Sequence, residues 1–320
     1  MRACARMFSL SPCYGAGGDL ATVTDANLVL GRVPPTTRLG GTMALDRDAA
    51  EAALSRLSAV SDGLDVSALA AGIVEVANEH MRQALRVISV ERGIDPRDFV
   101  LVSFGGAGGL HVCALAEGLG MRRAMVPADA GVLSALGMVV ARPGRRQSRT
   151  VRRALNSLRD DELQHLLREI AEPGIQALLA EGHARAELGL SFSADVCYRG
   201  QSFALNLPYT SLAALSEAFH QEHELRYGHR LQHALELVNL RAAIDLKTQC
   251  LTAAGSVPAL TPASAEPNAG SYPVYARAAL ACEQCIEGPA IVVDDVATTF
   301  IDPGWRATLD TSGNLILDLG

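Results

Sequence analysis

The chain has 320 residues, a net charge of −7 and an apolar content of 49%. This length is typical of two domains, and the apolar content is sufficient for packed cores, which excludes a disordered protein. No basic segment dominates and no apolar run approaches about 18 residues, so we expect neither a nucleic-acid partner nor a membrane span.

The first third of the chain changes from turns to helices. Residues 13–45 are rich in Gly, Thr and Asp and show no helical period, which predicts turns and short strands. A helix is expected to begin at Asp46, a typical N-cap residue. A longer helix is predicted over 67–91, ended by Gly93. Its expected inner face consists of Leu69, Ile73, Val76, Ala77, His80, Ala84, Val87 and Ile88.

The next segment alternates between strand and helix patterns. The apolar run "FVLVSF" at 99–104 predicts a buried strand, and a glycine-rich turn and a short helix follow it. A second strand is expected at 123–127, and the small residues of 130–141 predict another helix. This order indicates an α/β layer.

Composition changes at the basic, polar stretch 143–150, where we place a domain boundary. The predicted domains are therefore 1–148 and 149–320, the second being a smaller α+β domain. It is expected to hold helices at 159–181 and 211–226 and strands at 188–198, 202–207 and 235–249. A surface linker is expected at 251–272 because that segment is rich in Ala, Pro, Ser and Gly, and strands with turns complete the chain.

The seven cysteines are odd in number and scattered, which does not suggest a disulfide framework. The opening residues 1–15 contain only a short apolar patch, less than a signal peptide requires. We therefore expect a reducing, cytoplasmic setting.

The glycine turn "FGGAGG" at 104–109 has two alternative interpretations. Glycines between a strand and a helix let the backbone approach a nucleotide closely. However, Leu110 and His111 stand where the dinucleotide fingerprint needs a third small residue, and no Gly-Lys-Ser/Thr phosphate loop occurs. The alternative is a tight turn whose glycines serve packing alone.

Several long segments together resemble the hydantoinase A / 5-oxoprolinase family. They include "CYGAGGDLATVTDANLVLGR" (13–32), "SVERGIDPRDFVLVSFGGAGGLHVCALAEGLGM" (89–121) and "GPAIVVDDVATTFIDPGWRATLDTSGNLIL" (288–317). The resemblance extends over nearly the whole chain.

The resemblance implies an ATP-dependent opening of cyclic amides, as in N-methylhydantoinase and 5-oxoprolinase, with related subunits in ketone carboxylases. ATP and Mg²⁺ are the implied cofactors, and ATP phosphorylates the carbonyl oxygen of the substrate before water opens the ring. The implied fold is the second lobe of an actin-like or sugar-kinase-type ATPase, followed by the α+β domain. The glycine turn then lies over the adenosine, which assigns Gly105, Gly106, Ala107, Gly108 and, near the end of the long helix, Glu91 to nucleotide binding.

The chain departs from the family pattern at its front, because the family's phosphate loops have no counterpart here and "LSPCYG" replaces "GPACYG". We therefore expect only the C-terminal half of such an enzyme, without ATPase activity on its own. The expected partners are the missing N-terminal lobe and a hydantoinase B-type subunit. A homo-oligomer is also expected, because an unpaired lobe exposes apolar surface. The alternative functions are a non-catalytic assembly module and a subunit of an ATP-dependent ketone carboxylase.

Three polar residues are candidates for catalysis: Asp25 and Asn27 in "TVTDAN", and His111 after the glycine turn. Each has a structural alternative, since Asp and Asn cap helices and a histidine can pack against a carbonyl. Glu91 could likewise form an ion pair with Arg92. We expect no metal site, because neither the histidines of 220–233 nor the Cys282-x-x-Cys285 pair completes a ligand set.

Overall fold

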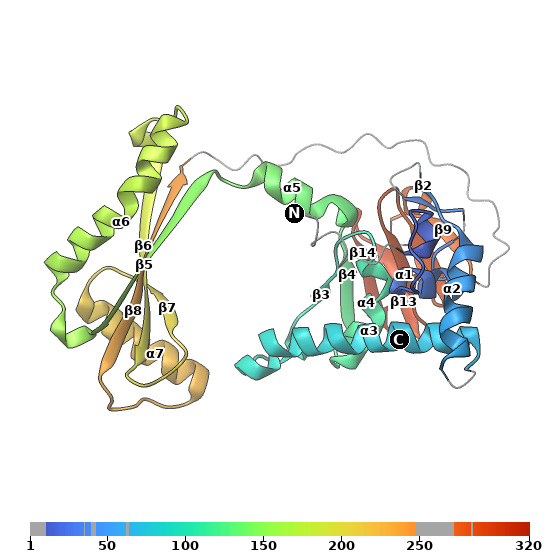
Figure 1. Ribbon diagram of the computed structural model, residues 1–320, viewed down its shortest axis with the longest axis horizontal. Coiled ribbons are helices and arrows are strands. Elements are labelled where there is room, and N and C mark those ends of the chain that lie inside the picture. Colours follow the sequence, from blue (N-terminus) through green and yellow to red (C-terminus); the bar gives the residue numbers. More distant parts are fainter. Residues whose placement is uncertain (1–10, 35, 40–42, 62–63, 248–271, 283) are drawn as a thin grey trace. The chain divides into compact units, whose positions relative to one another are not determined.

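The computed structural model describes residues 11–34, 36–39, 43–61, 64–247, 272–282 and 284–320. The chain divides into two compact units (Figure 1). The first combines Met1–Gly137 with Gly255–Gly320, and the second is Met138–Ala254. Both contain helices and sheets, which confirms the α/β character expected of the chain.

The first unit begins with helices. The elements up to the long helix are the 3₁₀ turn η2 (Pro12–Tyr14), α1 (Val23–Val29), the strand pair β1 (Arg38–Leu39) and β2 (Met43–Ala44), α2 (Arg47–Ala59) and α3 (Val66–Ile88). Asp46 caps α2 as predicted, because its carboxylate accepts a hydrogen bond from the N–H of Ala49. The helix α1 was not expected; a local capping box at Thr22 and Asp25 starts it without any apolar period.

Helices α1, α2 and α3 pack around one small core made by Ala26, Leu54, Ala70 and Val74. Only the first half of α3 takes part. The predicted inner face is therefore wrong at Val76, Val87 and Ile88, which are exposed, because the second half of α3 turns its Asn78 face toward α4 instead. A helical period identifies an apolar face, but it does not say whether a neighbour covers that face.

A five-stranded sheet in the order β10-β13-β14-β4-β3 forms the centre of the first unit. The bounds of the elements around it are η3 (Val90–Arg92), η4 (Pro96–Asp98), β3 (Leu101–Val102), η5 (Gly108–Leu110), α4 (Val112–Gly118), β4 (Arg123–Val126), η6 (Ala130–Val132), α5 (Leu133–Val140), β10 (Cys285–Glu287), β13 (Trp305–Leu309) and β14 (Leu315–Leu319). A smaller sheet has the order β12-β11-β9, formed by Thr298–Ile301, Ala290–Val293 and Val274–Ala276.

The pairing of β14 with β4 brings the end of the chain into the first unit. The two strands are antiparallel, with Leu317 opposite Ala124. Leu315 and Leu317 then share a core with Val112 and Ala116 of α4. The first crossing between the units, after Gly137, lies near the expected boundary at 148. The final strands differ from the expectation, because they pack with the first unit and not with 149–254.

The strand predicted at 99–104 is shorter and more exposed than expected. Only Leu101 and Val102 form β3, which lies at the edge of the sheet and pairs with β4 alone. Phe99, Val100, Val102 and Phe104 are exposed, so the expectation of a buried strand is wrong. An apolar run predicts a strand but does not supply its neighbours.

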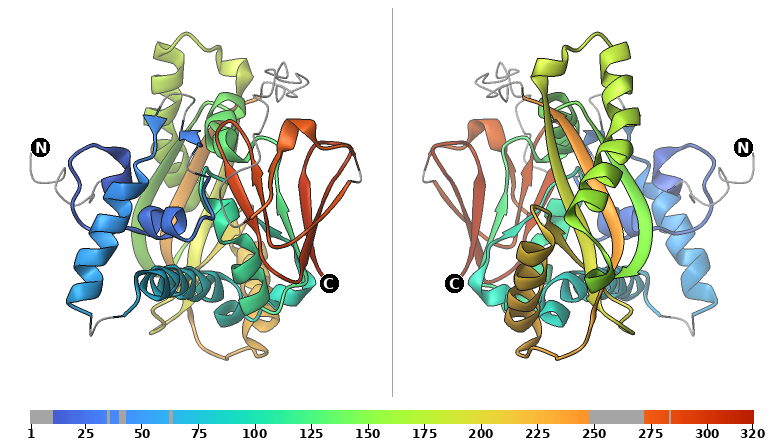
Figure 2. Two further views of the ribbon diagram at one scale, coloured as in Figure 1. Left: turned by 90° about the vertical axis from the view of Figure 1, so that its right-hand side faces the viewer. Right: turned by 90° about the vertical axis from the view of Figure 1, so that its left-hand side faces the viewer.

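The second unit is an antiparallel sheet in the order β5-β8-β6-β7, covered by two helices on one face (Figure 2). Its elements are β5 (Gly144–Ala154), η7 (Leu155–Ser157), α6 (Asp160–Ala180), η8 (Arg185–Glu187), β6 (Leu188–Tyr198), β7 (Leu205–Pro208), α7 (Leu212–Tyr227) and β8 (Leu235–Leu246). They confirm the predicted helices and strands of this region to within a few residues. The linker expected at 251–272 lies, except for Tyr272, outside the described residues.

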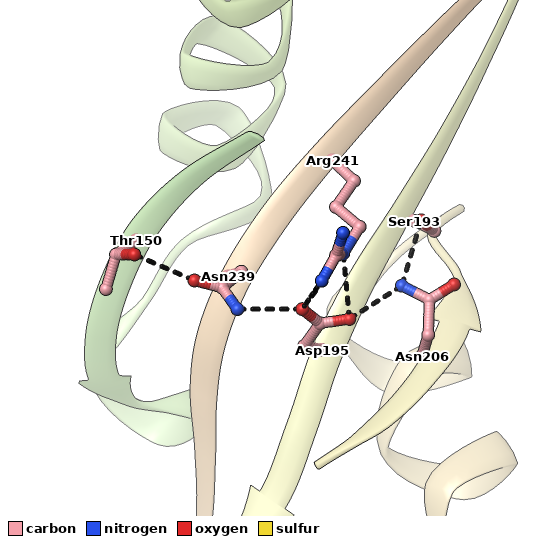
Figure 3. Close-up of polar contacts among 6 residues, drawn as sticks. All are labelled: Thr150, Ser193, Asp195, Asn206, Asn239 and Arg241. Atoms are coloured by element: carbon pink, nitrogen blue, oxygen red, sulfur yellow. Dashed lines mark hydrogen bonds and ion pairs between the residues drawn. The ribbon is translucent and has the colours of Figure 1, made fainter. Parts of the chain in front are cut away.

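The uncovered face of this sheet carries a hydrogen-bonded network around Asp195 on β6 (Figure 3). The Asp195 carboxylate accepts hydrogen bonds from Asn206 Nδ2 at 2.7 Å, Asn239 Nδ2 at 2.8 Å and Arg241 Nη2 at 2.7 Å. Burial alone would raise the pKa of Asp195, but these donors outweigh it and hold the pKa below its usual value. The Thr150 hydroxyl extends the network to β5 by donating to Asn239 Oδ1.

Replacing Asp195 with alanine should lower the free energy of unfolding by about 2 kcal/mol, because three donors lose their acceptor while the half-exposed Arg241 regains water. Denaturant unfolding monitored by circular dichroism measures this change. The control is Arg146→Ala, which breaks an exposed ion pair with Asp245 and should cost well under about 1 kcal/mol. Equal losses in the two variants would contradict a stabilising role of the network.

Candidate functional site

Asp25 lies at the first turn of α1 and is completely buried. Its carboxylate accepts hydrogen bonds from Ser11 Oγ at 2.7 Å, Thr22 Oγ1 at 2.8 Å, and the N–H groups of Cys13 at 3.0 Å and Thr22 at 2.8 Å. Burial raises its pKa, but the hydrogen bonds outweigh this effect and the pKa lies below the usual value. Asp25 is therefore an ionised anchor that ties α1 to residues 11–13, which favours the capping alternative.

Asn27 is also buried on α1. Its Nδ2 donates to the carbonyl of Val23 at 3.0 Å. Its Oδ1 is buried without a hydrogen-bond partner among the residues that the structure describes. An orphaned buried acceptor of this kind is uncommon, and it leaves Asn27 able to accept one further hydrogen bond.

Two backbone hydrogen bonds tie the glycine turn to more distant segments of the chain. The N–H of Gly105, a residue at φ +92°, donates to the carbonyl of Ala130 at 2.6 Å. The N–H of Thr298 donates to the carbonyl of Gly106 at 3.1 Å. Gly105 therefore serves the left-handed backbone of the turn, which side chains rarely adopt.

The glycines on either side of Ala107 differ in what surrounds them. A Cβ on Gly109 would lie 2.5 Å from Thr299 Oγ1 and 2.7 Å from the Thr298 carbonyl, so packing against β12 requires this glycine. Gly106 and Ala107 are exposed, and their N–H groups donate no hydrogen bond within the described part of the chain. Packing thus accounts for Gly109. A Cβ on Gly106 would lie 3.1 Å from the Val296 carbonyl, so Gly106 is closely packed on that side, whereas the exposed Ala107 is open to a ligand.

His111 follows the turn as the N-cap residue of α4 and is nearly buried. Its Nδ1 lies 2.7 Å from Asn78 Oδ1 on α3. An amide oxygen only accepts, so Nδ1 carries the proton and Nε2 keeps its lone pair. Burial, followed by the positive charge of Arg32, lowers the pKa of His111, which is therefore neutral at pH 7.

Arg32 adds charge near His111, and Asp302 adds charge near Arg32, although sequence reasoning gave neither a role in the site. The Arg32 guanidinium lies 4.7 Å from the centre of the Phe300 ring. Burial raises the pKa of Asp302, and the charge of Arg32 opposes that rise. Both residues lie in segments that carry the family resemblance, but no local pattern marks two charges so far apart in the chain as neighbours.

The remaining candidates are not joined to this site. Glu91 lies exposed in η3, and it forms no ion pair with Arg92 or with any other described residue. His220 and His223 instead contact Tyr198 of β6 through a hydrogen bond and a ring contact, which fastens α7 to its sheet.

Within the described ranges there is no group of three His, Cys, Asp or Glu side chains that could hold a metal ion. No helix there is long and apolar enough to cross a membrane.

Comparison with known proteins finds a matching family model and several relatives. The hydantoinase/oxoprolinase family model matches residues 3–147. The chain is 33% identical to the caprolactamase subunit alpha of Pseudomonas jessenii over 96% of this chain and 48% of that subunit. It is 30% identical to the 5-oxoprolinase PfmaA of Pestalotiopsis fici, over 92% of this chain and 25% of that protein.

Two solved structures extend the comparison. The crystal structure of the ATP-dependent caprolactamase from Pseudomonas jessenii superposes with a TM-score of 0.70 and 32% identity, covering 96% of this chain and 48% of that one. A nucleotide-free acetone carboxylase superposes with a TM-score of 0.66 at 23% identity, covering 98% and 48%, which shows a shared fold. The chain therefore spans about half the length of the caprolactamase subunit that it matches.

Gly109→Ala should lower the free energy of unfolding by about 1–3 kcal/mol, because the added methyl group overlaps with β12. The matched control is Gly72→Ala in α3, where a Cβ meets nothing within 4 Å and should stabilise the helix by about 0.5–1 kcal/mol. Thermal and urea unfolding measure both changes. A neutral Gly109→Ala variant would contradict the packing role.

The pKa of His111 makes the stability of the chain depend on pH. Because the folded-state pKa lies below 6.5, the unfolded state binds the proton first on acidification, and stability should fall as the pH drops through about 6.5. His111→Gln, which keeps an amide donor toward Asn78, should remove this part of the dependence. Urea midpoints measured between about pH 7.5 and 5.5 test it, and parallel curves for the two proteins would contradict the assignment.

Proposed function

Because the chain belongs to the hydantoinase/oxoprolinase family, we propose that it supplies one side of the nucleotide site of an ATP-dependent hydrolase acting on cyclic amides. The observation that carries this proposal is the match to the caprolactamase over 96% of this chain, both in sequence and in structure. The first unit then corresponds to the second lobe of an actin-like ATPase fold.

The reaction proposed has two steps. The carbonyl oxygen of the ring amide attacks the γ-phosphorus of ATP and ADP leaves, which gives an O-phosphorylated amide. In the second step water adds to the activated carbon and the C–N bond of the ring opens, which gives an amine and an acyl phosphate, and a second water hydrolyses the acyl phosphate to a carboxylate and phosphate. Phosphoryl transfer of this kind depends on positioning and on neutralising charge from several sides at once.

In this scheme the glycine turn contacts the adenosine side of ATP. Gly105, Gly106, Ala107 and Gly108 have little or no side chain, so the nucleoside can approach the backbone closely. The exposed Glu91 stays a predicted nucleotide-binding residue that no contact joins to this turn. His111 presents a neutral imidazole whose Nε2 can accept a proton or a hydrogen bond. Asp25 and Asn27 take a positioning role, because the carboxylate of Asp25 is already fully hydrogen-bonded.

The described residues hold no complete metal site of their own. Asp25, one of the candidate catalytic residues, has both carboxylate oxygens occupied by hydrogen bonds. No group of three His, Cys, Asp or Glu side chains that could hold a metal ion occurs among these residues. Because Mg²⁺ is usually held by one or two carboxylates together with phosphates and water, we propose that the phosphates of ATP supply most of its ligands.

Two kinds of partner complete the proposed enzyme. One supplies the part of the relatives that this chain does not match, including the phosphate-binding side of the cleft. The other is a hydantoinase B-type subunit, in keeping with the relatives named as subunits of larger enzymes. A ketone carboxylase subunit is the second candidate, favoured by the shared fold with acetone carboxylase.

The isolated 320-residue chain should not hydrolyse ATP, because one adenosine-side turn cannot hold a triphosphate in line with an acceptor. Phosphate release measures turnover, and calorimetry with a non-hydrolysable ATP analogue should give a Kd weaker than about 0.1 mM. Co-expression with the unmatched portion of the caprolactamase alpha subunit should restore ATP turnover in the presence of caprolactam. Gly106→Trp should then lower turnover at least about tenfold.

The control for that variant is Gly72→Ala, which lies away from the turn on α3. Turnover by the isolated chain in proportion to its concentration would overturn the proposal. Undiminished turnover with Gly106→Trp in the complex would remove the glycine turn from the nucleotide site.

A further inference from the structure

Cys282 and Cys285, on either side of the start of β10, are the exposed cysteines among the residues that the structure describes. Both are free thiols, whereas Cys13, Cys113 and Cys197 are buried. Burial raises the pKa of each buried thiol, and the pKa of Cys113 reaches about 12. Because the thiolate is the reactive form of cysteine, the buried thiols are inert, and within this part of the chain only the exposed pair is available for reaction.

Two hydrogen bonds fold the chain back between these cysteines. The N–H of Gln284 donates to the carbonyl of Ala281 at 3.1 Å, and the N–H of Ala281 donates to Gln284 Oε1 at 3.1 Å. The chain therefore turns between Ala281 and Gln284. This turn brings together two residues that an extended chain would hold about 10 Å apart.

Both cysteines also contact consecutive residues of β13. Cys285, the first residue of β10, lies opposite Thr308. The thiol of Cys282 donates to the carbonyl of Leu309 at 3.7 Å. Since successive residues of a strand are only about 3.4 Å apart along it, β13 holds the two cysteines side by side.

The position of β10 in the sheet leaves the pair open to solvent. This strand is terminal in the strand order and pairs with β13 alone. Ile286, the next residue along the strand, is buried in the core, so the side chain of Cys285 lies on the opposite, exposed face. A small thiol-reactive molecule can therefore reach both sulfur atoms without any part of the fold opening.

We propose that Cys282 and Cys285 form a redox-active dithiol, a modification site that a low-molecular-weight disulfide such as glutathione disulfide converts into an internal disulfide bond. One protein thiolate attacks a sulfur of the reagent, whose S–S bond breaks, which releases one reagent thiolate and leaves a mixed disulfide on the protein. The second protein thiolate then attacks the protein sulfur of the mixed disulfide and expels the second reagent thiolate.

The exchange is balanced in electrons and protons. The protein pair loses two electrons, the reagent is reduced to two thiols, and the two protons of the protein thiols pass to them. The reaction is reversible, because an excess of a reducing dithiol drives it back. This inference does not depend on the proposed function, since it involves neither the glycine turn nor a nucleotide.

Incubation of the folded 320-residue chain with glutathione disulfide, followed by alkylation of the remaining thiols and digestion with trypsin, tests this inference. Cleavage after Arg277 and Arg306 isolates both cysteines in one peptide. By mass spectrometry this peptide should have lost two hydrogen atoms and should carry neither glutathione nor an alkyl group. Treatment with dithiothreitol should restore both thiols.

Cys282→Ser and Cys285→Ser should each stop at the mixed disulfide, because the second thiol that resolves it is missing. The same peptide should then keep at least about tenfold more glutathione than in the wild-type chain. Melting temperatures establish that both variants, each at an exposed position, are folded. Cys113 is the internal control: cleavage after Arg97 and Arg122 isolates it, and its buried thiol should stay reduced.

Three results with the wild-type chain overturn the inference: a pair that stays reduced, a pair that keeps glutathione, and a bond from either residue to another cysteine. Oxidation of Cys113 at the same rate also overturns it, because exposure then does not select the pair. Resolution of the mixed disulfide in either serine variant as fast as in the wild-type chain contradicts the proposed exchange between the two thiols.

Discussion

The antiparallel pairing of β14 with β4 is the contact on which the first unit depends. It joins strands almost two hundred residues apart and places Leu315 and Leu317 in the same core as α4. The neighbouring strand β12 then reaches the glycine turn, where Thr298 binds the Gly106 carbonyl and Thr299 lies against Gly109. The geometry of the proposed adenosine contact is thus built from both ends of the unit, because neither segment makes the turn on its own.

The polar groups of the candidate site are of two kinds: those whose hydrogen-bonding positions are all occupied, and those that can still accept a hydrogen bond. Asp25 accepts four hydrogen bonds and can do little beyond fixing α1. Asn27 Oδ1 and His111 Nε2 retain an acceptor each, and both atoms belong to buried side chains. An unpaired polar atom in a core costs free energy, so the orphaned Asn27 Oδ1 is an uncommon feature of a packed helix.

The sequence by itself determined the features that depend on neighbouring residues. Asp46 and Ser211 start their helices through local caps, and the strand and helix patterns of the second unit appear almost where they were expected. The long motifs shared with hydantoinases and oxoprolinases determined the family in the same way. Among the candidate site residues, the glycine turn and His111 came from such local patterns, because a strand–turn–helix unit is formed by consecutive residues.

Only the tertiary structure decided what depends on contacts between distant segments. It placed the last strands in the first unit, left Phe99, Val102 and Ile88 exposed, and brought Asn78 and Arg32 to His111. It also gathered Asp195, Asn239 and Arg241 from two strands into one network. The periodic spacing of apolar residues predicts which side of a helix or strand can be buried. Whether that side is covered, and which charged groups pair, depends on the distant segment that packs against it.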